Sequence, residues 1–217
     1  MSSWEQQIEK DIEWREAEMA SLKLLLASAP TGSDRQRALL RACSAMLYAH
    51  YEGFCKACWA LLLDAIKAEA PLCCDLNEPI AKRALASVFK KLRGNTSSDN
   101  LWTFGISEFQ KHLKQAVIFI EEIDTESNLR PSLAQKINLS VGLQCHKFDL
   151  HKAELHQLVE RRNEIAHGEK MEIADMVQFQ KFEHAAWVAM HDLAIAVVEC
   201  LDNKSYLRPV EEPAMLI

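Results

Sequence analysis

Apolar residues recur every three or four positions along most of the chain, which is typical of helices that bury one face. The first such segment runs from about Trp4 to Ser28 and ends before a Pro-Thr-Gly turn. Ser33, with Gln36 three residues later, resembles a capping box at the start of a second segment from Asp34 to about Glu69. These patterns predict two long helices joined by a short turn.

The later part of the chain predicts shorter helices and then two more of intermediate or full length. Polar loops at 94–98 and 125–128 separate the shorter ones, which we expect to be peripheral or inserted elements. The predicted segments are Pro79 to Leu92, Ser107 to Glu122, Pro131 to Leu139, Leu150 to Ala166 and Ile173 to Leu201.

The composition favours an all-α fold. The chain has 217 residues, of which 49% are hydrophobic, and only six glycines and six prolines. That length can bury a sizeable core, and residues that break helices are scarce. We expect a single helical domain over residues 1–205 and a loose C-terminal tail over 206–217, where prolines limit further helix.

One helix carries a charge on its apolar face. Leu155, Leu158, Val159 and Ala166 mark a buried stripe, and Arg162 lies within about 20° of it. A guanidinium placed there needs a carboxylate partner or an anionic ligand. The ordinary interpretation is a buried ion pair, and the functional one is an anion clamp.

Two further polar residues follow this arginine, in the stretch Arg162-Asn163-Glu164-Ile165-Ala166-His167-Gly168. Arginine, an amide and a histidine can together hold an anion, orient a ring and transfer a proton near neutral pH. Taken alone, a histidine beside a helix-ending glycine is more often a satisfied terminal residue. The combination indicates phosphodiester chemistry.

The pattern resembles the HEPN domains, whose signature is an arginine, a polar residue and then a histidine. Arg162, Asn163 and His167 match the R-N-x-x-x-H form, and the segment from Met46 to Phe54 looks like the first core helix of a bacterial HEPN subgroup. The resemblance implies an all-α helical bundle with long core helices and short peripheral ones. It further implies a metal-independent endoribonuclease, often a toxin with an antitoxin or an antiphage defence effector. Other members are non-catalytic and bind RNA, nucleotides or partner proteins.

The resemblance also implies a homodimer with a composite active site. Residues five apart on an ideal helix diverge by roughly 140°, so Arg162 and His167 of one chain do not easily hold the same phosphate. Either the helix ends near Gly168 and turns His167 back, or a second copy brings its own pair alongside. In this hypothesis His167 is the general acid or base, Arg162 stabilises charge on the phosphate, and Asn163 holds the imidazole in one tautomer. Neither a metal nor a cofactor is expected. Some family members carry a regulatory tyrosine two residues after the histidine, where this chain has Glu169.

Two residues of the earlier core helix are candidates for supporting roles. Glu52 lies four residues after Tyr48 on the segment that resembles the family's core helix. Glu52 is expected either to meet Arg162 or to pair with Lys56 one turn further on. The sequence leaves both alternatives open.

The charge distribution gives a mixed indication for RNA. The net charge of −6 and pI of about 5.8 oppose general binding to polyanions. Several cations are nevertheless clustered, and they form either ordinary solvated faces or a track for RNA leading to Arg162. The candidates for RNA contact are Lys82, Arg83, Lys90, Lys91, Arg93 and Arg161.

The cysteines predict no metal centre. Cys55 and Cys58 form one CxxC pair, but no second pair or histidine pair completes a zinc site. Cysteines within helical apolar patterns are expected to be reduced core thiols in a cytoplasmic protein. The apolar run 193–198 is too short to span a membrane, for which about 20 residues are needed.

Overall fold

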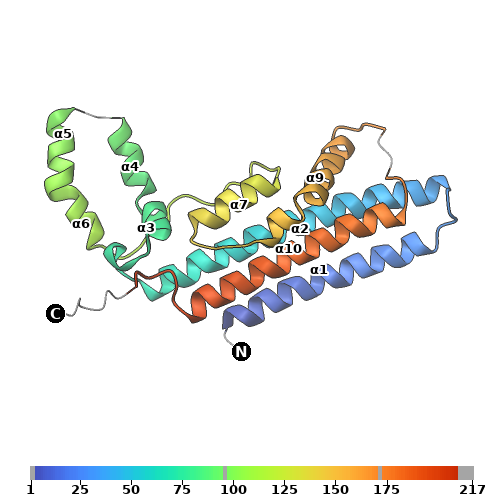
Figure 1. The fold of residues 1–217 in the computed structure, drawn as a ribbon, viewed down its shortest axis with the longest axis horizontal. Coiled ribbons are helices and arrows are strands. Elements are labelled where there is room, and N and C mark those ends of the chain that lie inside the picture. The colour runs from blue at the N-terminus through green and yellow to red at the C-terminus, as the bar shows by residue number, and fades with distance from the viewer. Residues whose placement is uncertain (1–2, 95–96, 171–172, 210–217) are drawn as a thin grey trace, which may run out of the picture.

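The computed structural model describes residues 3–94, 97–170 and 173–209, and within these ranges the protein is all-α. Three long helices form its centre: α1 (Ser3–Ala27), α2 (Asp34–Glu69) and α10 (Met176–Asp202). They run alongside one another for most of their length (Figure 1). Helix α2 packs against both of the others and against α9, so the core is built around it.

The ends of the long helices follow the local sequence. Ser33 caps α2 by accepting a hydrogen bond from the Gln36 backbone N–H, as the capping box predicts. The Gln36 side chain accepts the Gly32 N–H in return. Helix α10 begins three residues later than expected because Asp175 caps it through the Gln178 N–H.

Helix α10 owes its apolar composition to burial. By length and composition alone it is the one helix in the described ranges that passes a test for a membrane span, and half of its tested window is buried inside the bundle. Its inward face includes Phe179, Phe182, Met190 and Leu193, each at most 1% exposed. A core helix of a helical bundle passes the same test.

The chain between α2 and α10 forms a projecting part and a packed part. After a short 3₁₀ turn, Cys73–Asp75, come the helices α3 (Glu78–Ala84), α4 (Ala86–Arg93), α5 (Ser98–Thr103), a π-helical turn (Phe104–Glu108) and α6 (Phe109–Leu113). The packed part consists of α7 (Pro131–Ser140), α8 (Lys147–Leu150) and α9 (Lys152–Ala166). Figure 1 shows α4–α6 rising from one end of the bundle, while α9 crosses its other half at a steep angle.

The projecting part differs most from the prediction. The helix expected over 79–92 is broken at Leu85 into α3 and α4, and α5 lies partly in the expected loop. The helix expected over 107–122 ends at Leu113. Beyond that residue the chain is extended, because the Val117 backbone N–H bonds to the Pro71 carbonyl at 2.9 Å. This tertiary contact outweighs the local helical pattern.

Residues 206–208, at the start of the predicted loose tail, are attached to the bundle. Tyr206 is only 1% exposed, and its hydroxyl donates to Glu69 at 2.7 Å. The Arg208 backbone N–H bonds to the Asp75 carbonyl at 2.8 Å. The chain is therefore attached to the bundle through Arg208, and the rest of the predicted tail, residues 210–217, lies outside the described ranges.

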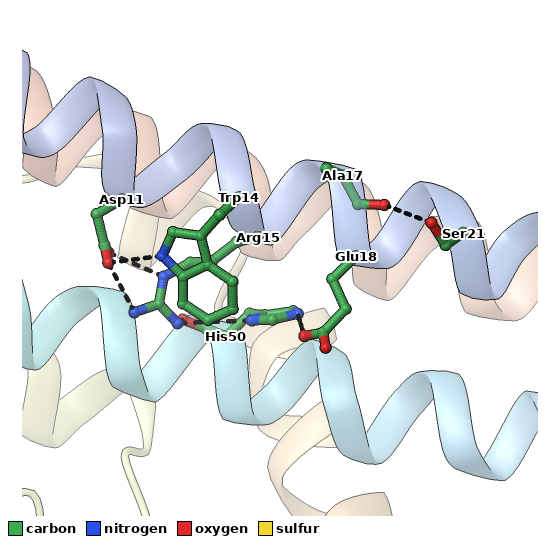
Figure 2. A network of polar contacts seen from close by, with 7 residues as sticks. All are labelled: Asp11, Trp14, Arg15, Ala17, Glu18, Ser21 and His50. Atoms are coloured by element: carbon green, nitrogen blue, oxygen red, sulfur yellow. Dashed lines mark hydrogen bonds and ion pairs between the residues drawn. The ribbon is translucent and has the colours of Figure 1, made fainter.

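A polar network joins α1 to α2 within the core (Figure 2). Arg15 is 7% exposed, donates to Asp11 at 2.9 Å and lies over the Trp14 ring. Its Nη1 is 3.5 Å from Nδ1 of His50, whose Nε2 is 3.1 Å from Glu18. Because Arg15 offers only donors, Nδ1 of His50 is the acceptor and Nε2 carries the ring proton. Burial, followed by the Arg15 charge, lowers the pKa of His50.

This lowered pKa predicts that acid weakens the contact between α1 and α2. Unfolded His50 takes up a proton near its ordinary pKa of 6.5, whereas the folded residue resists it. The stabilisation is complete above about pH 6.5 and is lost as pH falls through the lower, folded pKa, at up to about 1.4 kcal/mol per pH unit. Urea unfolding at about pH 7.5 and about pH 5.5 should show a smaller pH dependence for His50→Gln than for the native chain.

The control is His146→Gln, which replaces an exposed ring and should retain the native pH dependence. Equal pH dependence in the native chain and in His50→Gln would contradict the assignment of a neutral, buried His50.

Candidate functional site

The candidate site lies at the C-terminal end of α9. Leu155, Leu158 and Val159 are fully buried and fix this helix on α2. The helix ends in a Schellman motif: Gly168 has φ +73°, and the Glu169 N–H bonds to the Glu164 carbonyl at 2.9 Å. Glycine permits this left-handed turn, so the sequence ends the helix directly beside the histidine of the motif.

Arg162 is half-buried and held in one orientation. Its guanidinium carbon lies 4.5 Å from the centre of the Tyr48 ring, a cation–π contact. Its Nη1 donates to the Ser127 carbonyl at 3.1 Å and to Oδ1 of Asn163 at 3.0 Å. Within the described residues, Nε and Nη2 have no hydrogen-bond acceptor. Arg162 is therefore positioned through one nitrogen and retains donors for a ligand.

A hollow of about 370 Å³ between α2 and α9 lies beside this arginine. Its floor on α2 is made of small residues, Ala45, Ala49 and Gly53, and Lys56 stands at its edge. Arg162 and Lys56 are its cations, and Glu52, which lies 3.6 Å from Lys56, also lines it, so the lining carries a net charge of +1. Such a hollow suits a phosphate or another small anion.

Asn163 is placed with Arg162 rather than with the histidine. Its Oδ1 accepts from Arg162, and its Nδ2 donates to Oδ1 of Asn128 at 3.1 Å. The expected contact between Asn163 and the imidazole one turn later is therefore not made. Both the arginine and the amide of the motif hold the loop before α7.

His167 is the residue at which α9 ends, and its side chain is exposed. It does not line the hollow beside Arg162. The described part of the chain supplies its imidazole with no hydrogen-bond or ion-pair partner. One chain therefore presents the two residues of the motif to different surroundings.

Tyr48 and Glu52 form the support beneath Arg162. The Tyr48 hydroxyl accepts the Leu129 backbone N–H at 2.8 Å, and Glu52 accepts from the Thr125 hydroxyl. Burial, with the nearby Glu52 carboxylate, raises the pKa of Tyr48, so the phenol stays protonated. Of the two alternatives for Glu52, the structure shows the ion pair with Lys56, at 3.6 Å.

The loop over residues 125–129 is the part of the site that the sequence did not reveal. Thr125 and Leu129 are completely buried, and Glu126 and Ser127 both have left-handed backbones, with φ of 56° and 48°. Successive non-glycine residues of this kind are costly and persist only where neighbouring contacts impose them. The polar Thr-Glu-Ser-Asn stretch predicts a loop, but no local signal shows that two helices hold it.

The candidate RNA-contacting residues do not form one track to Arg162. Those on α3 and α4 belong to the end of the bundle away from α9 (Figure 1). Several have protein partners: Lys82 pairs with Glu78, Arg83 donates to the Glu121 carbonyl and Arg161 pairs with Glu164.

Arg41 of α2 is a further cation that lies near the end of α9. Its guanidinium donates to the Glu169 carbonyl at 3.0 Å and so fixes the turn after His167. In the sequence it appears as part of a separate basic cluster with Arg35 and Arg37. Only the fold brings it to the end of α9.

The thiols are packing residues, as expected. Cys43, Cys55, Cys58 and Cys200 are buried, and burial raises the pKa of each. Across residues 3–94, 97–170 and 173–209, no three histidine, cysteine or acidic side chains are grouped as metal ligands.

The fold and the motif together define an all-α bundle that carries R-N-x-x-x-H at the end of a helix packed on its longest member. The model of the MAE_28990-like HEPN family matches residues 4–206. The chain therefore belongs to this HEPN family. Comparisons with curated proteins and with solved structures return no match.

The contacts of Tyr48 predict a specific loss of stability. Tyr48→Phe keeps the ring beneath Arg162 but leaves the buried Leu129 N–H without its acceptor. We expect a loss of about 1–3 kcal/mol in the free energy of unfolding. Chemical denaturation measures this loss as a shift of the unfolding midpoint, with the slope of free energy against denaturant concentration the same for both proteins.

Tyr51→Phe is the matched control on the same helix. The Tyr51 hydroxyl is buried and has no hydrogen-bond partner in the described ranges, so its removal should change stability by less than about 0.5 kcal/mol or increase it. Equal losses in both variants would show that the Leu129 contact contributes nothing specific.

Proposed function

We propose that the protein is a metal-independent endoribonuclease whose site is formed by Arg162, Asn163 and His167. HEPN membership makes ribonuclease activity or nucleotide binding the relevant classes. The observation that carries the proposal is Arg162 itself, oriented by Tyr48, Ser127 and Asn163 with its Nε and Nη2 donors still available. Donors fixed before the substrate arrives stabilise charge without reorganisation in the transition state.

The proposed reaction is an internal transfer of the phosphodiester. The 2′-hydroxyl attacks the adjacent phosphorus while a histidine removes its proton, and the bond from phosphorus to the 5′-oxygen breaks. A second proton donor supplies the leaving oxygen. The products are a 2′,3′-cyclic phosphate and a free 5′-hydroxyl. Arg162 stabilises the charge on the non-bridging oxygens, and no water or metal enters this step.

A second copy of the chain completes this site in the proposal. The exposed His167 lies outside the hollow beside Arg162. Two chains that bring their α9 ends together would place two histidines and two arginines around one phosphate. Such a homodimer has the self-complementary interface that twofold symmetry provides.

The second candidate function is a non-catalytic module that binds RNA, a nucleotide or a partner protein. Arg162 and Asn163 both hold the 125–129 loop, which is a structural task sufficient to retain them. The net charge of −6 also opposes strong general binding of RNA. Cleavage experiments separate the two candidates.

Purified protein in excess EDTA should cut total cellular RNA into discrete fragments that end in 2′,3′-cyclic phosphate. Arg162→Ala and His167→Ala should each lower the rate at least about 100-fold, because each removes a transition-state stabiliser or proton-transfer group. Gel analysis with mapping of product ends measures both effects. His156→Ala, which changes another α9 histidine, should cut at the native rate.

The folding and the oligomeric mass of the native chain and its variants are measured alongside this assay. All variants should keep the helical circular dichroism of the native chain, and light scattering should give twice the monomer mass of 24.7 kDa. No cleavage by an equally folded dimer would favour the binding module, while cleavage that survives His167→Ala would exclude the named site.

The biological role within this proposal is a toxin of a toxin–antitoxin pair or an effector of antiphage defence. Induced expression of the native chain should then slow growth, and His167→Ala should restore it at equal folded yield. Growth curves matched for protein level by immunoblotting measure this. Equal growth with both forms would exclude unrestrained toxicity.

A further inference from the structure

The projecting segment that spans α4 to α6, residues 86–114, is here named the arm. It carries five lysines and arginines and two acidic residues, a net charge of +3. Since the whole chain has a net charge of −6, the remainder carries −9. The arm is therefore a basic element on an acidic body, and an anionic ligand is attracted to it selectively.

The arm contributes little to the hydrophobic core. No residue of α4, α5, the π-helical turn or α6 is buried. Its apolar side chains pack mainly on one another: the Phe104 and Phe109 rings lie 5.6 Å apart, and Phe89 is 6.3 Å from Phe109. Trp102 at its far end is 71% exposed. Core stability alone does not explain such an element.

A cleft of about 510 Å³ opens between α4 and the α5–α6 strip. Lys91 and Lys111 stand on its opposite walls, with His112 beside Lys111. In the described residues neither lysine has an ion-pair partner. Glu108 is the one carboxylate among the lining residues, so the two opposed lysines leave the cleft a net charge of +1, which suits a phosphate group.

The other walls of the cleft suit a base or a ribose. Asn100, Thr103 and Gln115 contribute hydrogen-bonding groups, and Phe104 contributes an aromatic ring. Phe104 and Glu108 lie on the π-helical turn, a rare geometry that often marks functional sites. Aromatic side chains beside cations are the usual means of holding unpaired bases.

We propose that this cleft is a second RNA-binding site, which holds one nucleotide of a single-stranded segment while another part of the strand lies at Arg162. This inference rests on the proposed function only in taking RNA as the substrate. The cleft volume of about 510 Å³ is large enough for a nucleotide. The exposed Trp102 offers a neighbouring base a stacking surface.

The test uses a fluorescent single-stranded 2′-O-methyl RNA of about twelve nucleotides, within the range of single-strand site sizes. This RNA lacks the attacking hydroxyl, so binding is measured by anisotropy whether or not the protein cleaves RNA. Lys91→Gln/Lys111→Gln should weaken binding and reduce the slope of log affinity against log salt by about 1.4. Trp102→Ala should weaken binding at least about fivefold.

The matched control, Lys10→Gln/Lys181→Gln, removes two exposed lysines from α1 and α10 and should bind as the native chain does. Equal weakening by both double variants would reduce the effect to overall charge and overturn the inference. Unchanged binding in the arm variant, or a change only in its oligomeric mass, would also overturn it and would indicate a protein-docking arm.

Further measurements distinguish an RNA strand from a free nucleotide as the ligand of the cleft, and the arm proposal from the ribonuclease proposal. RNA should protect Lys91 and Lys111 from acetylation, read by mass spectrometry, but leave Lys10 and Lys181 reactive. Adenosine monophosphate alone should bind more weakly than the oligonucleotide, and equal affinity would assign the cleft to a free nucleotide instead. Absence of cleavage by the native chain with this binding intact would overturn the proposed ribonuclease and leave the arm assignment standing by itself.

Discussion

The rotation of α2 about its own axis is the constraint on which the rest of the structure depends. One face of this helix offers His50 to the polar network of α1, and another offers Tyr48 and Glu52 to α9 and the loop. Gly53 lies between them, and a Cβ there would be 3.1 Å from Arg15. The buried contacts with α1 therefore fix the rotation of α2, and with it the position of the Tyr48 ring that Arg162 packs against.

The long helices were predictable because their signals are local. Ser33 with Gln36 fixed the start of α2, the 3.6-residue period fixed its buried face, and Gly168 fixed the end of α9. The placement of Arg162 beside an apolar seam followed from the same period. Each of these features depends on residues a few positions apart, so an unaligned sequence contains the information.

The loop and the arm were not predictable in this way, because contacts distant in sequence determine them. Glu126 and Ser127 adopt left-handed backbones without the glycine that usually signals them, since Tyr48, Arg162 and Asn163 hold the loop. The extended chain after α6 depends similarly on a backbone bond to Pro71. The contacts of Arg162 could not be identified either, because the pattern left a carboxylate or an anionic ligand open and the fold supplies an aromatic ring.

The hollow beside Arg162 is bounded on α2 by small side chains. Close approach of Arg15 accounts for Gly53, and Ala45 and Ala49 form the rest of this floor. An arginine retained only to hold the loop needs one nitrogen, whereas this one leaves two nitrogens without acceptors in the described part of the chain. The guanidinium is only half-buried, so these donors can bind an anion without displacing a protein partner. Since His167 faces other surroundings, the ribonuclease proposed above would take the proton-transfer group for that anion from a second α9, and assembly would then be a condition of its activity.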